Sequence, residues 1–129
     1  MYLLPGRGLL IAGGLKGRVL DTVEMFDLEN LTSCVVTVTL DQPRLDHTGD
    51  GDLVCGGVGE YWNLLSTCYN IVNGTTINLT NGRQLHTSWS TGDGTYLIGG
   101  EQLANNHRTT ELISGGSTQA GFQLRNASG

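Results

Sequence analysis

The chain has few charged residues, few aromatic residues and almost no proline. Only 15% of its 129 residues are charged and 6% are aromatic, and two prolines stand against 20 glycines. No extended window keeps apolar positions at the helical spacing of about 3.6 residues, so an amphipathic helix is not expected. The apolar runs LLIAG, VVTVTL and TYLIG are instead short and bounded by turn residues. The sequence therefore predicts an all-β protein.

Basic residues are also scarce and are not grouped. The chain has seven Lys and Arg residues and twelve Asp and Glu residues, which gives a net charge of -5. Binding of nucleic acid phosphates needs clustered cations, so we expect no nucleic-acid partner. No apolar run reaches the roughly 18 residues of a membrane-spanning helix, and we expect no membrane insertion. The opening MYLLPGRGLLIAGG is split by Pro5 and Arg7 and does not resemble a signal peptide.

Motifs for catalysis and metal binding are missing too. The sequence has no CxxC pair, no paired histidines at zinc-ligand spacing and no phosphate-binding glycine loop. We therefore expect no enzyme, no metal and no cofactor. Asp46, Asp50 and Asp52 suggest calcium, but they lack the spacing of an EF-hand loop, and a turn explains the Asp-Gly steps equally well.

What the sequence does contain is a repeat. The stretch RQLHTSWSTGDGTYLIGG at 83–100 has a degraded copy, RLDHTGDGDLVCGG, at 44–57, and its tail recurs as GLLIAGG at 8–14. Three glycine pairs end these stretches and follow one another at intervals of 43 residues: Gly13-Gly14, Gly56-Gly57 and Gly99-Gly100. A period of 40 to 50 residues that ends short apolar strands indicates blades of a β-propeller.

The repeat divides the chain into about three four-stranded antiparallel blades. Blade one covers 1–41 and is expected to lack its first strand, blade two covers 42–81, and blade three covers 82–129. The expected strands are 8–14, 22–28 and 34–40; 47–48, 52–55, 66–72 and 75–79; and 86–90, 95–98, 109–113 and 121–124. Twelve residues after each glycine pair, strand three is expected to carry a large inward side chain, which is Phe26, Tyr69 or Leu112.

These repeats resemble the kelch family of β-propellers. The resemblance rests on the segments Arg44-x-x-His47-Thr48 and Arg83-x-x-His86-Thr87, on the glycine pairs and on the aromatic residue of strand three. The tryptophan that the family carries after this aromatic residue is absent, which indicates degenerate packing. Because kelch propellers close with five to seven blades, the resemblance implies a partial propeller. The remaining blades are expected from a longer chain or from a second copy.

The resemblance also implies a non-catalytic binding module. Kelch propellers place the arginine ahead of strand one near the channel mouth, so Arg44 and Arg83 are candidates for binding an acidic peptide or glycan of a partner. The alternative is that each arginine braces its own turn. Trp62, in a loop, is a further candidate contact, whereas Trp89 is expected to pack normally. Other functions remain open: a remnant of a copper oxidase of the galactose-oxidase type, or an intracellular kelch adaptor.

Cysteines and glycosylation sequons bear on the compartment. Cys55 and Cys68 should face each other on neighbouring strands and form a disulfide, although two buried thiols are an alternative; Cys34 is left free or paired elsewhere. Four Asn-x-Ser/Thr sequons are glycosylation candidates: Asn30, Asn73, Asn78 and Asn126. Together they favour a secreted glycoprotein, with a cytoplasmic protein as the alternative, since Asn-Thr pairs are also good turn formers.

Overall fold

The computed structural model describes residues 2–4, 8–27, 29–50, 52–102, 105–106, 109–114 and 116–123, and it contains three four-stranded antiparallel sheets. Blade one consists of β1 (Tyr2–Leu4), β2 (Gly8–Ala12), β3 (Thr22–Asp27) and β4 (Thr32–Thr39). Blade two consists of β5 (Thr48–Asp50), β6 (Leu53–Cys55), β7 (Thr67–Asn70) and β8 (Thr76–Asn78). Blade three consists of β9 (Thr87–Thr91), β10 (Gly94–Ile98), β13 (Thr109–Ser114) and β14 (Ser117–Gln123). The predicted all-β fold of three antiparallel blades is confirmed.

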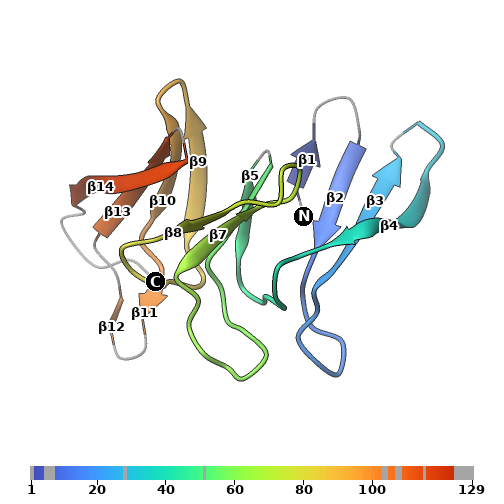
Figure 1. Ribbon diagram of the computed structural model, residues 1–129, viewed down its shortest axis with the longest axis horizontal. Helices are drawn as coiled ribbons and strands as arrows, with labels where there is room; N and C mark the ends of the chain where they lie inside the picture. Colours follow the sequence, from blue (N-terminus) through green and yellow to red (C-terminus); the bar gives the residue numbers. More distant parts are fainter. Residues whose placement is uncertain are drawn as a thin grey trace.

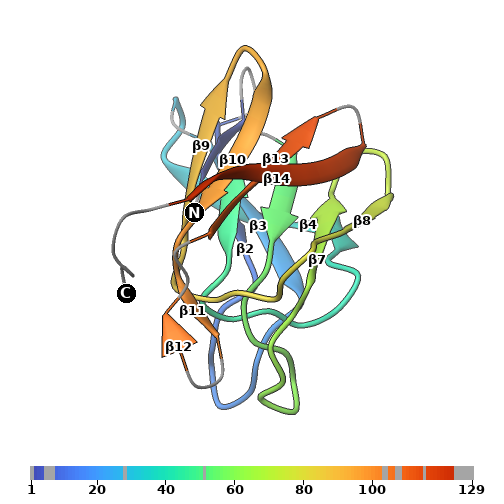
Figure 2. The same cartoon turned by 90° about the vertical axis from the view of Figure 1, so that its left-hand side faces the viewer.

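The three blades stand next to one another in chain order (Figure 1). The first strands β1, β5 and β9 are neighbours across the blades, and the outer strand β8 lies near β14. The connections between second and third strands extend from the same end of the molecule in both views (Figures 1 and 2). In blade three this connection forms a small hairpin of β11 (Glu101–Gln102) and β12 (Asn105–Asn106), which the sequence did not predict. No helix in the described part of the chain is long and apolar enough to cross a membrane.

Blade one has its first strand, contrary to the prediction. Tyr2–Leu4 forms β1, which pairs antiparallel with β2 from Tyr2 opposite Leu10 to Leu4 opposite Gly8. The segment carries none of the Arg-x-x-His pattern that precedes the first strands of the other blades, so the repeat did not reveal it. Backbone pairing needs only an extended segment at the sheet edge, and Tyr-Leu-Leu supplies one.

In the part of the chain that the structure describes, two apolar layers lie between adjacent blades. One layer joins blades one and two through Ala12, Val23, Leu40, Val54 and Ile71, with Met25 and Tyr69 packed against it. The other joins blades two and three through Cys55, Cys68, Ile77, Leu79, Leu97 and Ile113. Because successive strand residues point to opposite faces, the side chain of Val54 packs in the first layer and that of Cys55 packs in the second. Each blade is therefore stabilised mainly by its neighbours.

The large side chain of strand three in blade three is buried as expected, since Leu112 is 7% exposed, but it does not point to the same face as Tyr69. Tyr69 lies opposite Val54, and Val54 is two positions before Gly56. Leu112 lies opposite Tyr96, and Tyr96 is three positions before Gly99. A shift of one residue moves a side chain to the other face of a sheet. Tyr69 consequently packs towards the preceding blade, and Leu112 points away from it.

The glycine pairs end the second strands as predicted, and all six residues have positive φ, between 66° and 108°. At Gly56, an added Cβ would lie 2.5 Å from the carbonyl oxygen of Arg83, which belongs to the next blade. At Gly57, it would lie 2.5 Å from the carbonyl oxygen of Leu45 in its own blade. Glycine is needed here both for the backbone conformation and for the approach of neighbouring chain segments.

Candidate functional site

Arg44 is fully buried inside blade two and binds main-chain atoms of that blade. Its Nη1 donates to the carbonyl oxygens of Gly56 (3.0 Å) and Thr67 (2.8 Å). Its Nη2 donates to Thr67 Oγ1 (2.8 Å) and to the Asp41 carboxylate (3.1 Å). Burial lowers the pKa of the guanidinium and the Asp41 charge opposes that change. The side chain holds the ends of β6 and β7 together.

Arg83 repeats this arrangement in blade three with a more deeply buried counter-ion. Its Nη1 donates to the carbonyl oxygens of Gly99 (3.1 Å) and Thr109 (3.0 Å), and its Nη2 donates to Glu111 Oε1 (3.2 Å). Glu111 is only 2% exposed, and its carboxylate also accepts from the backbone N–H groups of Thr80 and Asn81. This cluster joins the strands of blade three to the loop that enters it.

The assignment of Arg44 and Arg83 as ligand-binding residues is therefore wrong in this structure, and the bracing alternative holds. Both side chains are 0% exposed. Their terminal nitrogens are occupied by carbonyl, hydroxyl and carboxylate oxygens. A partner could reach them only after the blade had opened.

The same segments also tie each blade to the one before it. The backbone N–H of Gly14 donates to Arg44 O, and that of Gly57 donates to Arg83 O, both at 2.8 Å. His47 Nε2 donates to Ala12 O across the first blade junction at 2.8 Å. In the second junction, His86 Nε2 lies 2.8 Å from Thr48 Oγ1. Both repeated histidines thus contact the preceding blade.

We expect acid to destabilise the protein through His47. Burial lowers its pKa from 6.5 to about 4, and the hydrogen bond to Ala12 only partly opposes this. The neutral ring is thus favoured by folding, so its contribution is complete above about pH 6.5 and is lost as the pH falls towards 4, a loss of up to about 3 kcal/mol. Urea unfolding at about pH 7.5 and about pH 4.5 measures the loss. A His47→Gln variant, which keeps a donor but does not titrate, should lose distinctly less; an equal loss in both proteins would contradict the assignment.

Cys55 and Cys68 form the predicted disulfide. They lie directly opposite each other on β6 and β7, with Cα atoms 4.0 Å apart, and both are buried. They face blade three, where Leu97 belongs to the same apolar layer. The side chain of Cys34 lies outside the described residues, so its pairing stays a prediction.

The loop between β6 and β7 presents two exposed aromatic side chains. Tyr61 is 85% exposed and Trp62 is 64% exposed. The loop is held by hydrogen bonds from Gly59 N to Asn63 O (2.9 Å) and from Trp62 N to Gly59 O (3.0 Å). Trp62 adopts a φ of 61°, a conformation that is unfavourable for a bulky residue and often marks functional loops. Trp62, a candidate contact residue from the sequence, is thus exposed, and its contact with a partner stays a prediction.

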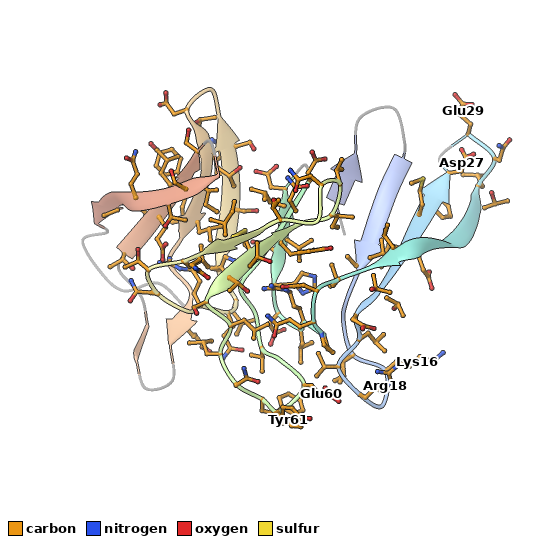
Figure 3. All side chains as sticks on the ribbon, in the orientation of Figure 1. Lys16, Arg18, Asp27, Glu29, Glu60 and Tyr61 are labelled. Atoms are coloured by element: carbon orange, nitrogen blue, oxygen red, sulfur yellow. A yellow bond between two sulfur atoms is a disulfide. The ribbon has the colours of Figure 1, made fainter. Side chains whose placement is uncertain are left out.

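The loop between β2 and β3 extends from the same end and carries exposed cations. Leu15, Lys16 and Arg18 are exposed, and a hydrogen bond from Lys16 N to Arg18 O closes the turn. Figure 3 shows Lys16, Arg18, Glu60 and Tyr61 at the tips of these loops, pointing away from the sheets. Asp27 and Glu29 lie at the opposite end of blade one. The tips of these two loops thus combine two aromatic groups, two cations and the Glu60 carboxylate.

Trp89 is not packed as expected. It is 64% exposed on β9, where it lies opposite Tyr96 of β10. The expectation of ordinary packing for Trp89 is therefore wrong.

The acidic residues around the β5–β6 connection lie at a groove; Gly51 itself is outside the described residues. Asp50 and Asp52 flank the β5–β6 connection and line a polar groove of about 370 Å³ between blades two and three. Among the residues that the structure describes, no group of three or more His, Cys, Asp or Glu is arranged to hold a metal ion. The copper-oxidase alternative gains no support from this part of the chain.

Three of the four sequons are in described positions. Asn30 and Asn73 are exposed in turns, and Asn78 is exposed on the outer strand β8. Asn73 Oδ1 accepts hydrogen bonds from the backbone N–H and the hydroxyl of Thr75, as in a compact turn. Asn126 lies outside the described residues. These positions are accessible to glycans, and glycosylation itself stays a prediction.

Comparison with known proteins supports the fold. No protein-family model matches the chain, and a search of curated proteins found no match. A solved structure of a protein named YjhT is similar to 97% of the chain, with a TM-score of 0.75 and 11% sequence identity. At this identity the similarity concerns the fold alone. The chain spans about half of the YjhT chain, 51% of its length.

Proposed function

We propose that the chain is part of a secreted kelch-type propeller that acts as a non-catalytic binding scaffold. The observation that carries this proposal is the exposed pair Tyr61 and Trp62, held on an ordered loop. Tyrosine and tryptophan are enriched at protein interfaces because their rings bury a large area at a small loss of side-chain entropy. The buried disulfide and the exposed sequons support an oxidising compartment.

The partner that we propose is an acidic peptide or glycan. Lys16 and Arg18 take the role first given to Arg44 and Arg83, because they are exposed at the same end as the aromatic pair. Guanidinium and ammonium groups bind carboxylates, and the aromatic rings can stack on apolar parts of the ligand.

We expect Trp62→Ala to weaken binding of a short fluorescein-labelled peptide of alternating Glu and Tyr by roughly 10- to 30-fold, the loss typical of an interface tryptophan. Arg18→Ala should weaken it less, and added salt should reduce the affinity further. Fluorescence anisotropy with purified protein measures both effects.

Leu31→Ala is the matched control, because Leu31 is equally exposed but lies in the turn at the opposite end. It should bind the peptide as the unmodified chain does. Equal affinities of all three variants would contradict the proposed surface. Stoichiometric copper with oxidation of simple alcohols would overturn the non-catalytic function.

A further inference from the structure

The face of blade three that points away from blade two carries a row of large side chains. Trp89 lies opposite Tyr96, and Tyr96 lies opposite Leu112, so the three share one face. Leu97 and Ile113 point to the other face and pack against blade two. The row across β9, β10 and β13 therefore lies on the face of blade three that no other described blade covers, where Trp89 is 64% exposed and Leu112 is 7% exposed.

The outer face of blade one is equivalent to the face by which blade two packs on its preceding blade. Val23 and Met25 of β3 pack towards blade two, so Phe26 points to the opposite face, together with Ile11 of β2. Phe26 and Ile11 occupy the same positions relative to the glycine pair as Tyr69 and Val54 in blade two. In blade two these positions form the face that packs on the preceding blade.

We propose that a second copy of this chain covers both faces, with blade three of each copy packed on blade one of the other. At each of the two junctions inside the chain, the face of one blade that carries Val54 or its equivalent packs on the face of the preceding blade that carries Ala12 or its equivalent. The outer face of blade one is equivalent to the Val54 face, and the outer face of blade three is equivalent to the Ala12 face. This favours head-to-tail contact over contact between identical faces. Such contacts form a closed ring when the rotation per copy divides a full turn.

The number of blades fits a ring of two copies. Blade one is complete because β1 is present, so each copy supplies three four-stranded blades. Two copies give six, within the usual range of about four to eight blades for a closed propeller. YjhT, whose fold is similar, is about twice as long as this chain.

The experiment is light scattering coupled to size-exclusion chromatography at micromolar protein. The unmodified chain should have twice the 13.8-kDa mass of one copy. Trp89→Asp and Phe26→Asp should each weaken association by roughly 30-fold or more and give monomers, because each places a carboxylate in the same junction from opposite sides. Trp62→Asp is the control, since Trp62 is as exposed as Trp89 but lies on a loop tip. It should remain dimeric.

Mixing the two variants provides the sharpest test. A Trp89→Asp copy and a Phe26→Asp copy can still form one junction between two unmodified faces, so the mixture should contain heterodimers that neither variant forms alone. Circular dichroism establishes that the variants are folded. A monomeric unmodified chain overturns the proposal. So does a dimer that is insensitive to Phe26→Asp, which would join identical faces, and so do open assemblies larger than two copies.

Discussion

Replacing Arg83 by alanine is expected to lower the free energy of unfolding by about 3 to 5 kcal/mol, the cost of removing one partner from a buried ion pair. The change would leave the Glu111 carboxylate, which is 2% exposed, without its cation. It would also remove the donors to the carbonyl oxygens of Gly99 and Thr109. A loss of this size is a large part of the stability of an ordinary domain. Urea unfolding followed by circular dichroism measures it.

Arg44→Ala is the matched comparison and should cost less. Its counter-ion Asp41 is 21% exposed at the side chain and can be hydrated when the guanidinium is removed. The lost hydrogen bonds to Gly56 and Thr67 should still lower the stability by about 1 to 3 kcal/mol. If both variants kept full stability and lost only peptide affinity, the arginines would belong to a binding site and the bracing role would be wrong.

The sequence could predict the blades because the features that define them are local. A glycine pair with positive φ ends each second strand, where a carbonyl oxygen of the next blade approaches Gly56 and one of the same blade approaches Gly57, so the pair recurs with the repeat. The disulfide was predictable for a similar reason. Cys55 and Cys68 belong to one hairpin, and pairing across a hairpin follows from the strand positions alone.

Side-chain roles could not be predicted where they depend on distant contacts or on loop length. The direction of Arg83 is set by Glu111 and Thr109, which follow it by 28 and 26 residues. Leu112 changed face because the connection before it places β13 one residue out of step with β7. The strand β1 has no motif at all. The candidate loop surface had a partial signal in Trp62, whereas Lys16 and Arg18 gave none, because exposure at a shared end is a property of the fold.

Reduction of the Cys55–Cys68 bond is expected to lower the free energy of unfolding by about 3 kcal/mol, since the bond closes a loop between residues 13 positions apart and so restricts the unfolded chain. Urea unfolding with and without dithiothreitol measures the effect. Cys34→Ser is the control variant and should keep the full response to reductant.

Thiol labelling determines whether the bond is present in the protein tested. The native, unreduced chain should not label at Cys55 or Cys68, and peptide mapping after reduction should find both; labelling of all three cysteines in unreduced secreted material would contradict the pairing. The response also shows where the stabilisation arises. Because both cysteines lie in the layer between blades two and three, a reduced protein with normal secondary structure but lower stability would place the effect in the unfolded chain. Loss of the β-sheet signal on reduction would mean that the bond is needed to hold this layer together.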